Sequence, residues 1–590
     1  MGNQACSEGC LSDPLAANFR MNAIHERLFP MYVVKVSDFL QMEGAPRPHN
    51  VLRDEGLLHE WYPGMFAIFV SHQWLGASEP DPEGKQVEVL RSVLRGFVDG
   101  SLQVEPHVAS MVYSGFVPTW PSSMSSYIAH GFLFFDWFAI PQITARQEGV
   151  NEQETKSEAA KAVQSIPAYV EACSLFLVLA PELLHIETKK LCNYSTWLSR
   201  GWCRAELWLW LLSNRADTSV VIVFSATEAE FMVQSDWQDN SIAGGDFTVP
   251  ADRAVVCKLG EAAAAGKQRH LQSRGPIDAF RFFLAQKQKF LDSQPEPWNE
   301  EEFVARLRFE SMEDAARNRD GMNGLLCGVY AGDVRLVRRL VDLQADVNRR
   351  VRGLGEFGLY DGMTPLIIAA RSNQEPEVLR TLIDLRADVG IRVKHTGLGP
   401  AGLLRTAAHV QVLLDARADL HSSELPMGLN PLSSIAGHAT AEAVAAMLAA
   451  RCSPNPPLRG VGCGPLQAIA VFARGKRDAA TKALMLMEAR ADLNVRACPS
   501  GFFQRLCQSA RVRAALWGFD SCATKTRFLA SLPGITPLGM AALVGDEALA
   551  ELFLEAGAEV IPNDRGDTPD VLAAANHHTR LAASLAVVHF

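Results

Sequence analysis

The sequence predicts two unlike parts, an α/β domain with a parallel sheet followed by an all-α solenoid of repeated helices. The first prediction rests on short apolar runs that alternate with segments of helical spacing within residues 61–235. Such alternation requires crossover helices that pack back onto the sheet, which gives a doubly wound fold. The second rests on a motif that recurs from about residue 322 onward. A chain of 590 residues is also too long for one hydrophobic core.

Four short apolar runs are the predicted strands of the α/β domain. Each is bounded by polar or turn-forming residues, which is typical of a strand buried on both faces. The predicted strands are residues 66–70, 132–135, 175–179 and 220–224, and the predicted helices are residues 84–97, 153–172 and 202–212. We expect Pro167 to interrupt the second helix. Residues 1–60 are expected to form a tail and an irregular segment.

Polar and aromatic residues follow the first two predicted strands. Ser71, His72 and Trp74 come directly after the first strand, and Asp136 and Trp137 follow the second. Ligand sites in open α/β sheets lie outside the carboxyl ends of the strands. These five residues are therefore the candidate substrate-binding residues.

A tryptophan-rich stretch covers residues 197–212, with the sequence WLSRGWCRAELWLWLL. It contains four tryptophans and a single acid, Glu206. A carboxyl group in such an apolar helix is expected either to have a polar or charged partner or to have a functional role. Either Glu206 pairs with Arg200 or Arg204, or it works at a site, and the sequence leaves both alternatives open.

The order of these elements resembles the TIR domain. In that family the first strand ends in Phe-x-Ser, and a later helix carries Ser-x-Trp-Cys-x-x-Glu-Leu. Phe69 and Ser71 match the first pattern; Ser199, Trp202, Cys203, Glu206 and Leu207 match the second, with one extra residue between Ser199 and Trp202. The resemblance covers roughly residues 60–230 and implies a flavodoxin-like sheet order. Residues 71–74 and 136–142 depart from typical TIR sequences.

The resemblance also implies two functions. In TIR domains that hydrolyse NAD, the catalytic glutamate occupies the position of Glu206, so NAD is a candidate substrate and Glu206 the candidate catalytic residue. Other TIR domains are not catalytic, and the domain then provides assembly or signalling through self-association. Cleavage of the nicotinamide–ribose bond passes through an oxocarbenium-like state, which a carboxylate stabilises, while Trp74 or Trp137 could stack on the base.

Other chemistry is not expected. Ser71 and His72 are neighbours on a strand, so their side chains point to opposite faces and do not form a serine-hydrolase pair. The twelve cysteines include no C-x-x-C pair, and His72 has no partner at metal-ligand spacing. We expect no metal and no cofactor.

A recurrent motif marks the second part as a repeat array. Its copies lie at residues 340–348, 382–389, 413–420, 487–494 and 554–560. Residues 364–370, TPLIIAA, resemble the ankyrin signature T-P-L-H-x-A-A. Pro431 and Pro465 are 34 positions apart, close to the ankyrin period of about 33. We expect about seven ankyrin repeats in residues 319–590, the third degenerate at 398–421, with an insertion near 495–532. Such arrays bind partner proteins.

Five repeats lack the glycine that ankyrin repeats usually place after the second helix. Gln344, Arg386, Arg417, Arg451 and Arg490 stand there, and Gly557 is the exception. A residue with a side chain costs about 1 kcal/mol in the left-handed conformation of that position. Either the turn adapts, or the arginines are used, for example as a ladder along one surface. Solvated arginines without a role are the third alternative.

Charge, targeting signals and the linker complete the predictions. A net charge of −10 argues against nonspecific nucleic-acid binding. Without a secretory segment or a bilayer-spanning run, a cytoplasmic location is expected.

The first residues, MGNQACS, resemble an N-myristoylation site, so Gly2, Cys6 and Cys10 are candidate lipidation sites for peripheral membrane attachment; a disordered tail is the alternative. Residues 236–318 are the expected linker, in which 279–290 form a basic amphipathic helix.

Overall fold

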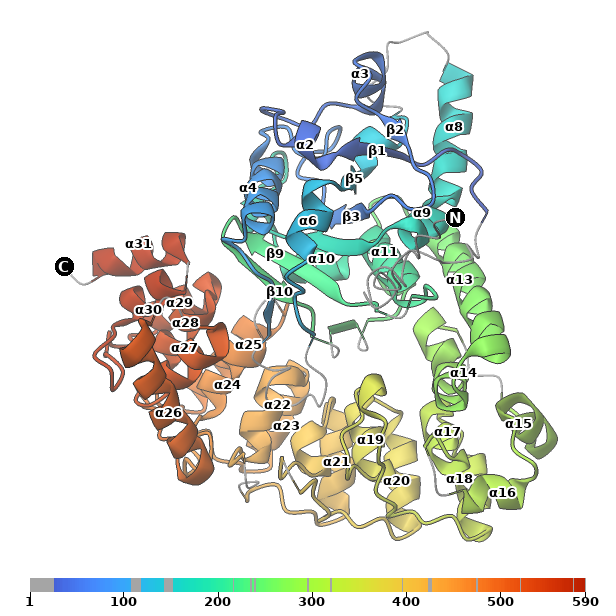
Figure 1. The fold of residues 1–590 in the computed structure, drawn as a ribbon. Coiled ribbons are helices and arrows are strands. Elements are labelled where there is room, and N and C mark those ends of the chain that lie inside the picture. The colour runs from blue at the N-terminus through green and yellow to red at the C-terminus, as the bar shows by residue number, and fades with distance from the viewer. Residues whose placement is uncertain are drawn as a thin grey trace, which may run out of the picture. The chain divides into compact units, whose positions relative to one another are not determined.

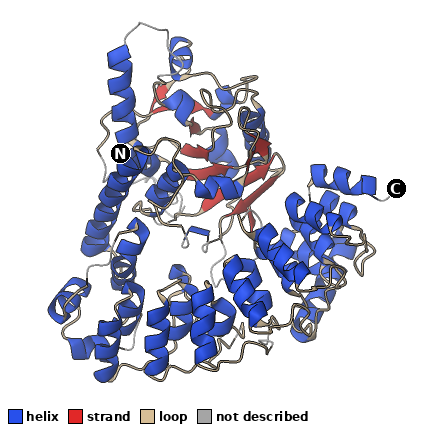
Figure 2. Cartoon of the chain, turned by 180° about the vertical axis from the view of Figure 1, so that it is seen from behind, coloured by secondary structure: helices blue, strands red, loops and turns tan. Residues whose placement is uncertain are grey.

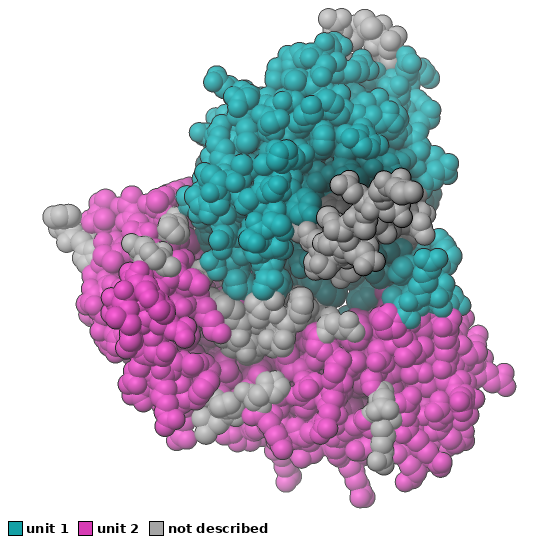
Figure 3. Space-filling view, viewed as in Figure 1, with its two compact units in different colours: residues 1–106, 118–275, 289–293 teal, residues 107–117, 276–288, 294–590 magenta. Residues whose placement is uncertain are grey.

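The computed structural model describes most of the chain and divides it into two compact units. The described residues are 26–107, 118–142, 152–215, 217–233, 236–237, 240–293, 297–318, 321–394, 396–422, 427–473, 476–519, 522–576 and 578–588. The lipidation candidates Gly2, Cys6 and Cys10 lie outside these residues. One unit comprises residues 1–106, 118–275 and 289–293, and the other comprises 107–117, 276–288 and 294–590 (Figure 3). The domain boundaries of the sequence analysis stay a prediction.

The first unit is built on a mixed sheet in which the described strands follow the order β2-β1-β5-β3-β6-β9-β10-β4 (Figure 1). The central strands β5, β3, β6 and β9 are parallel, whereas β1 and β10 pair antiparallel at their flanks. The strands are β1 Tyr32–Lys35, β2 His59–Glu60, β3 Ala67–His72, β4 Glu105–Pro106, β5 Phe132–Phe134, β6 Leu175–Leu179, β9 Val220–Ser225 and β10 Glu228–Phe231. A separate hairpin joins β7 Leu183–Leu184 to β8 Leu191–Cys192. The four predicted strands are therefore confirmed, in a flavodoxin-like order.

Helices cover both faces of this sheet (Figure 2). Ile68 and Val70 of β3 share a core with α4 (Lys85–Asp99) and α6 (Met124–Ala129). Phe69 points to the other face, where Phe176 lies against Trp210 of α11 (Gly201–Leu211) with ring centroids 5.5 Å apart. This alternation follows from the two-residue period of a strand. The predicted break at Pro167 is confirmed, since α8 (Glu152–Gln164) ends before α9 (Ile166–Ala172) begins.

The prediction of an irregular segment up to residue 60 was wrong for its described part. This part contributes β1 and β2 to the sheet, together with α2 (Val36–Phe39) and α3 (His49–Asp54). The apolar patch around Val34 is too short to identify a strand by its pattern. It becomes one because Val34 pairs with Leu133 of β5 and is fully buried.

The second unit consists mainly of paired helices, as expected for ankyrin repeats. The pairs are α17 Gly324–Ala331 with α18 Val334–Asp342, α19 Pro365–Arg371 with α20 Pro376–Asp384, η3 Pro400–Leu403 with α21 Ala407–Asp415, α22 Pro431–His438 with α23 Ala441–Ala449, α24 Pro465–Phe472 with α25 Ala479–Glu488, α28 Pro537–Val544 with α29 Glu547–Glu555, and α30 Pro569–Ala575 with α31 Thr579–Val588. In the third pair the first helix is only a 3₁₀ turn. A further pair, α26 (Gly501–Trp517) and α27 (Thr524–Ser531), stands between α25 and α28.

Further helices lie in the chain between the last strand of the sheet and the first repeat. They include α13 Asp252–Arg274, α14 Ile277–Leu291, α15 Glu300–Leu307 and α16 Met312–Arg317. No helix among the described residues is both long and apolar enough to cross a bilayer.

The repeat helices start as their sequence predicts. The Thr364 hydroxyl accepts from the N–H of Ile367, and Thr536 accepts from Gly539. A proline follows each threonine in the first helical turn, where its missing N–H costs nothing. Each cap satisfies one backbone donor that the helix itself leaves unpaired.

The turn after the second helix does not adapt to its arginines. Gln344, Arg386, Arg417, Arg451 and Arg490 have φ values of 75°, 70°, 55°, 62° and 66°. Each is therefore in the left-handed region, like Gly557 at 90°. The chain keeps a strain of about 1 kcal/mol at each of these positions, and all five side chains are exposed.

Candidate functional site at the carboxyl edge of the sheet

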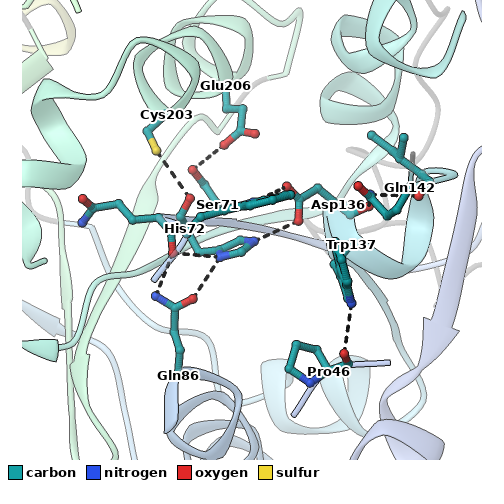
Figure 4. A network of polar contacts seen from close by, with 12 residues as sticks. Pro46, Ser71, His72, Gln86, Asp136, Trp137, Gln142, Cys203 and Glu206 are labelled. Carbon is teal, nitrogen blue, oxygen red and sulfur yellow. Dashed lines mark hydrogen bonds and ion pairs between the residues drawn. The ribbon is translucent and has the colours of Figure 1, made fainter. Parts of the chain in front are cut away.

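The carboxyl end of β3 places Ser71 and His72 on opposite sides of the sheet, beside Val178 and Leu179 of β6. Asp136 follows β5, the neighbour of β3 on the other side, as the first residue of the short helix α7 (Asp136–Ala139). The sheet order thus gathers residues far apart in the sequence at one edge (Figure 4).

His72 is held between two hydrogen-bond acceptors. Gln86, on α4, donates from Nε2 to the carbonyl oxygen of Gln73. This bond orients the Gln86 amide so that its Oε1 lies 2.9 Å from Nδ1 of His72. Nε2 of His72 lies 2.9 Å from Oδ1 of Asp136. A histidine ring donates from both nitrogens only as the imidazolium. Burial is the largest single influence on the pKa of His72 and lowers it. The charge and hydrogen bond of Asp136, together with the charge of Glu206 and the hydrogen bond to Gln86, outweigh burial, so the pKa lies above its ordinary value.

Asp136 links His72 to the aromatic residues of the site. Its second oxygen accepts from Nε1 of Trp74 at 3.1 Å, and a third of its side chain remains exposed. Burial is the largest single influence on the pKa of Asp136 and raises it, but the charge of His72 and the hydrogen bonds from His72, Trp74 and the backbone N–H of Trp137 together hold it below its ordinary value. Trp137 is buried, donates to the carbonyl of Pro46 at 3.0 Å, and meets the ring of Trp74 edge-on. His72 and Asp136 therefore form an ion pair that fixes Trp74.

Glu206 faces the same edge from the middle of α11. The Ser71 hydroxyl donates to Oε2 of Glu206 at 2.5 Å and accepts from Nε1 of Trp197 at 3.1 Å. The Ser71 hydroxyl thus uses one lone pair for Trp197 and its single hydrogen for Glu206. Among the described residues, no side chain other than Ser71 bonds Glu206, so its Oε1 has no partner there.

Two carboxyl groups at this edge have opposite protonation preferences. Burial raises the pKa of Glu206 to about 8, against the hydrogen bond from Ser71, and the negative charge of Asp136 raises it further. Glu206 still has partial solvent contact. At neutral pH the site therefore holds a largely neutral Glu206 beside an ionised Asp136. Carboxyl groups whose environments separate their pKa values in this way are typical of acid–base sites.

Glu206 does not form the ion pair with Arg200 or Arg204 that the sequence left open as an alternative. Arg204 turns away, donating to the carbonyl of Leu198 and to the side chain of Asn240 at 2.7 Å. Arg200 makes no ion pair with Glu206 either, within the described residues. The tryptophans of this stretch bond elsewhere, with Trp202 to Asp252, Trp208 to Asn240 and Trp210 to Ser219. The aromatic residues therefore build the surrounding core, while Glu206 is left for the site.

The comparisons with known proteins bear on the second unit. An ankyrin repeat model matches residues 361–394. That range begins before the capping residue Thr364 and ends beyond α20, so it includes one complete helix pair. No curated protein matches the chain. An ankyrin repeat suggests protein binding, and implies a protein partner in general.

Two residues of the site were not predicted from the sequence. Gln86 is a buried amide on the apolar face of α4, four residues before Leu90. A polar residue within an apolar helical stripe is the signal that could have identified it. Trp197 carries no comparable signal, because its role depends on α10 (Tyr194–Ser199) bringing its N–H to Ser71.

Within the described residues, no group of three or more His, Cys, Asp or Glu side chains is arranged to hold a metal ion. The side chains at this edge of the sheet are a carboxyl group with one oxygen that no described residue bonds, an ion pair, and a half-buried indole ring.

Proposed function

We propose that this chain is an interaction and signalling protein. Its ankyrin-like array binds a partner protein, and its α/β domain is a TIR-like module that supplies the signalling output. The matched repeat and the series of helix pairs support the first half of the proposal. The flavodoxin-like strand order and the motif residues Ser71 and Glu206 at one edge support the second.

Of the two signalling roles proposed for the α/β domain, the geometry favours NAD cleavage over assembly alone. The observation that carries this is the bond from Ser71 to Glu206, because it leaves the carboxyl group at the ligand edge without an arginine partner. A purely structural acid in this helix would be expected to pair with a cation. Self-association without catalysis is the second candidate, which the resemblance alone favours.

In the proposed reaction, Glu206 acts in its ionised form. The nicotinamide–ribose bond breaks, and the ring nitrogen takes the electron pair and leaves as neutral nicotinamide. The carboxylate stabilises the positive charge that develops on the ribose. Water then adds to the ribose carbon and gives its proton to Glu206, which yields ADP-ribose. The positively charged nicotinamide ring of bound NAD lowers the pKa of Glu206 and so favours the carboxylate that the reaction needs.

Nicotinamide release tests this proposal. The purified full chain is incubated with NAD at high protein concentration, because assembly can be required for activity. Glu206→Gln keeps the shape of the side chain and should abolish release. Glu88→Gln, on the exposed face of α4, is the matched control and should leave release unchanged. Release that survives Glu206→Gln would reject the assigned residue, and absence of release would leave assembly as the output.

Assembly has its own measurement. Sedimentation velocity of the full chain over a range of concentrations shows whether the protein self-associates. If it stays monomeric at every concentration and releases no nicotinamide, both forms of the proposed output are rejected.

A further inference from the structure

Helix α26 exposes large apolar side chains to solvent. The exposed fractions are 63% for Phe502, 58% for Val512, 72% for Leu516 and 67% for Trp517. Isolated surface hydrophobic residues are ordinary, but four of them on one 17-residue helix form a patch. This patch is distinct from the site around Glu206.

The other face of α26 is already occupied. Ala510 and Ala514 are buried in a small core with Cys522 and with Ala530 of α27, and Cys507 of α26 is buried as well. The buried face of α26 therefore carries small side chains, whereas the four large apolar side chains of the patch are exposed to solvent. This division is the reverse of an ordinary surface helix, in which the largest apolar residues enter the core.

The exposed face of α26 is also basic. Phe502, Arg505, Val512, Arg513 and Leu516 follow the three- and four-residue spacing of one helix face. No acid occurs in residues 501–517, although the whole chain has a net charge of −10. Among the described residues, none forms an ion pair or a side-chain hydrogen bond with Arg505, Arg511 or Arg513.

The predicted amphipathic helix at 279–290 provides a comparison. It is present as α14, but its Phe280, Phe282 and Phe283 are buried, and Phe282 packs on Phe357 with ring centroids 4.7 Å apart. Its aromatic residues are thus used within the protein, unlike Phe502 and Trp517 of α26.

We propose that α26 is a membrane-surface helix that docks the protein on anionic lipid. Arginine and large apolar residues share its exposed face, and a bilayer interface accepts both. The arginine stems lie along the acyl chains while the guanidinium groups reach the phosphates, and the aromatic rings enter the headgroup region. A protein groove would have to supply a separate carboxylate for each arginine between its apolar contacts. The helix lies in the surface and does not span it.

Vesicle sedimentation tests this proposal. Full-length protein made in bacteria without an N-myristoyltransferase is used, so that no acyl chain contributes. It is mixed with vesicles of phosphatidylcholine alone and with vesicles of equal phosphatidylcholine and phosphatidylserine. We expect sedimentation with the anionic vesicles only, and release at high salt. Each arginine replaced by glutamine should weaken binding about fivefold.

Two variants separate this helix from the rest of the chain. The pair Leu516→Ser and Trp517→Ser should reduce vesicle binding strongly, while Leu484→Ser, an exposed leucine of α25 (45% exposed), should not. Thermal unfolding verifies that each variant is folded. Equal binding to both kinds of vesicle, no binding, or binding that the double variant leaves intact would overturn the proposal. A double variant that loses binding to a purified protein partner but has no effect on vesicles would assign the patch to that partner instead.

Discussion

Ser71 donates its hydroxyl hydrogen to Glu206 over 2.5 Å, from the carboxyl end of β3 to the middle of α11. This bond connects the two motifs on which the resemblance to the TIR domain depends. It also fixes the orientation of a carboxyl group whose pKa is raised to about 8. Several properties of the protein should therefore respond to changes at these two residues.

Ser71→Ala should shift the pH dependence of nicotinamide release to higher pH. The Ser71 hydrogen bond favours the carboxylate, so its loss raises the pKa of Glu206 further above its ordinary value. Release at neutral pH should fall severalfold and recover in part at higher pH. The pH profile of kcat/KM measures this shift. Ser199→Ala is the control, because its hydroxyl donates to the carbonyl of Thr196 instead; an unshifted profile in Ser71→Ala would contradict the assignment.

Glu206→Gln should alter the pH dependence of stability. A carboxyl group with a raised folded-state pKa binds its proton in the folded state between about pH 4.5 and 8, where the unfolded chain has lost it. Its contribution to the free energy of unfolding is full below pH 4.5 and decreases as pH rises to 8. The free energy of unfolding of the variant, measured with urea, should therefore increase relative to that of the wild type as pH rises toward 8. A constant difference would show that Glu206 is ionised at neutral pH.

Arg386→Gly should stabilise the array by about 0.5 to 1 kcal/mol, because Arg386 has a φ of 70°. Arg380→Gly, within α20 of the same helix pair, is the matched control. It should destabilise by about 1 kcal/mol, since glycine is unfavourable inside a helix. Chemical unfolding of both variants gives the two values. Loss of stability in Arg386→Gly would indicate that the arginine side chain makes a stabilising contact.

Lys482→Met should remove an alkaline rise in stability. Lys482 of α25 is fully buried, donates to the carbonyl of Ala439 at 3.0 Å and lies 3.3 Å from Asp478. Burial lowers its pKa to about 8. The unfolded chain then binds more protons between about pH 8 and 10.5, so stability should rise across that range in the wild type. Equal slopes in the two proteins, measured by thermal unfolding against pH, would contradict the lowered pKa.

Much of the fold could be predicted because local patterns and global structure agree. The run around Phe69 is a strand whichever neighbours it has, and Thr364 with Pro365 starts a helix by a local mechanism. Strand β1 could not be predicted, because it depends on pairing with Leu133 across the sheet. The sequence left open whether the turn adapts to its arginines, and only the positive φ of Arg386 and its equivalents shows that it does not.

The candidate site was predicted in its residues but not in its interactions. Strand-end logic identified Ser71, His72 and Asp136, since the carboxyl ends of parallel strands meet at one edge. The partner of Glu206 could not be read from the sequence, because arginines lie close to it in the chain while Ser71 is 135 positions away. Contacts of that range depend on the packing of α11 against the sheet.

The most direct test of this account is the rate of nicotinamide release from NAD, measured for the full chain and for Glu206→Gln at the pH where Glu206 is ionised. The account predicts release by the wild type that increases with pH up to about 8, and none by the variant. Equal release by the two proteins, or release that does not depend on pH in this range, would contradict it.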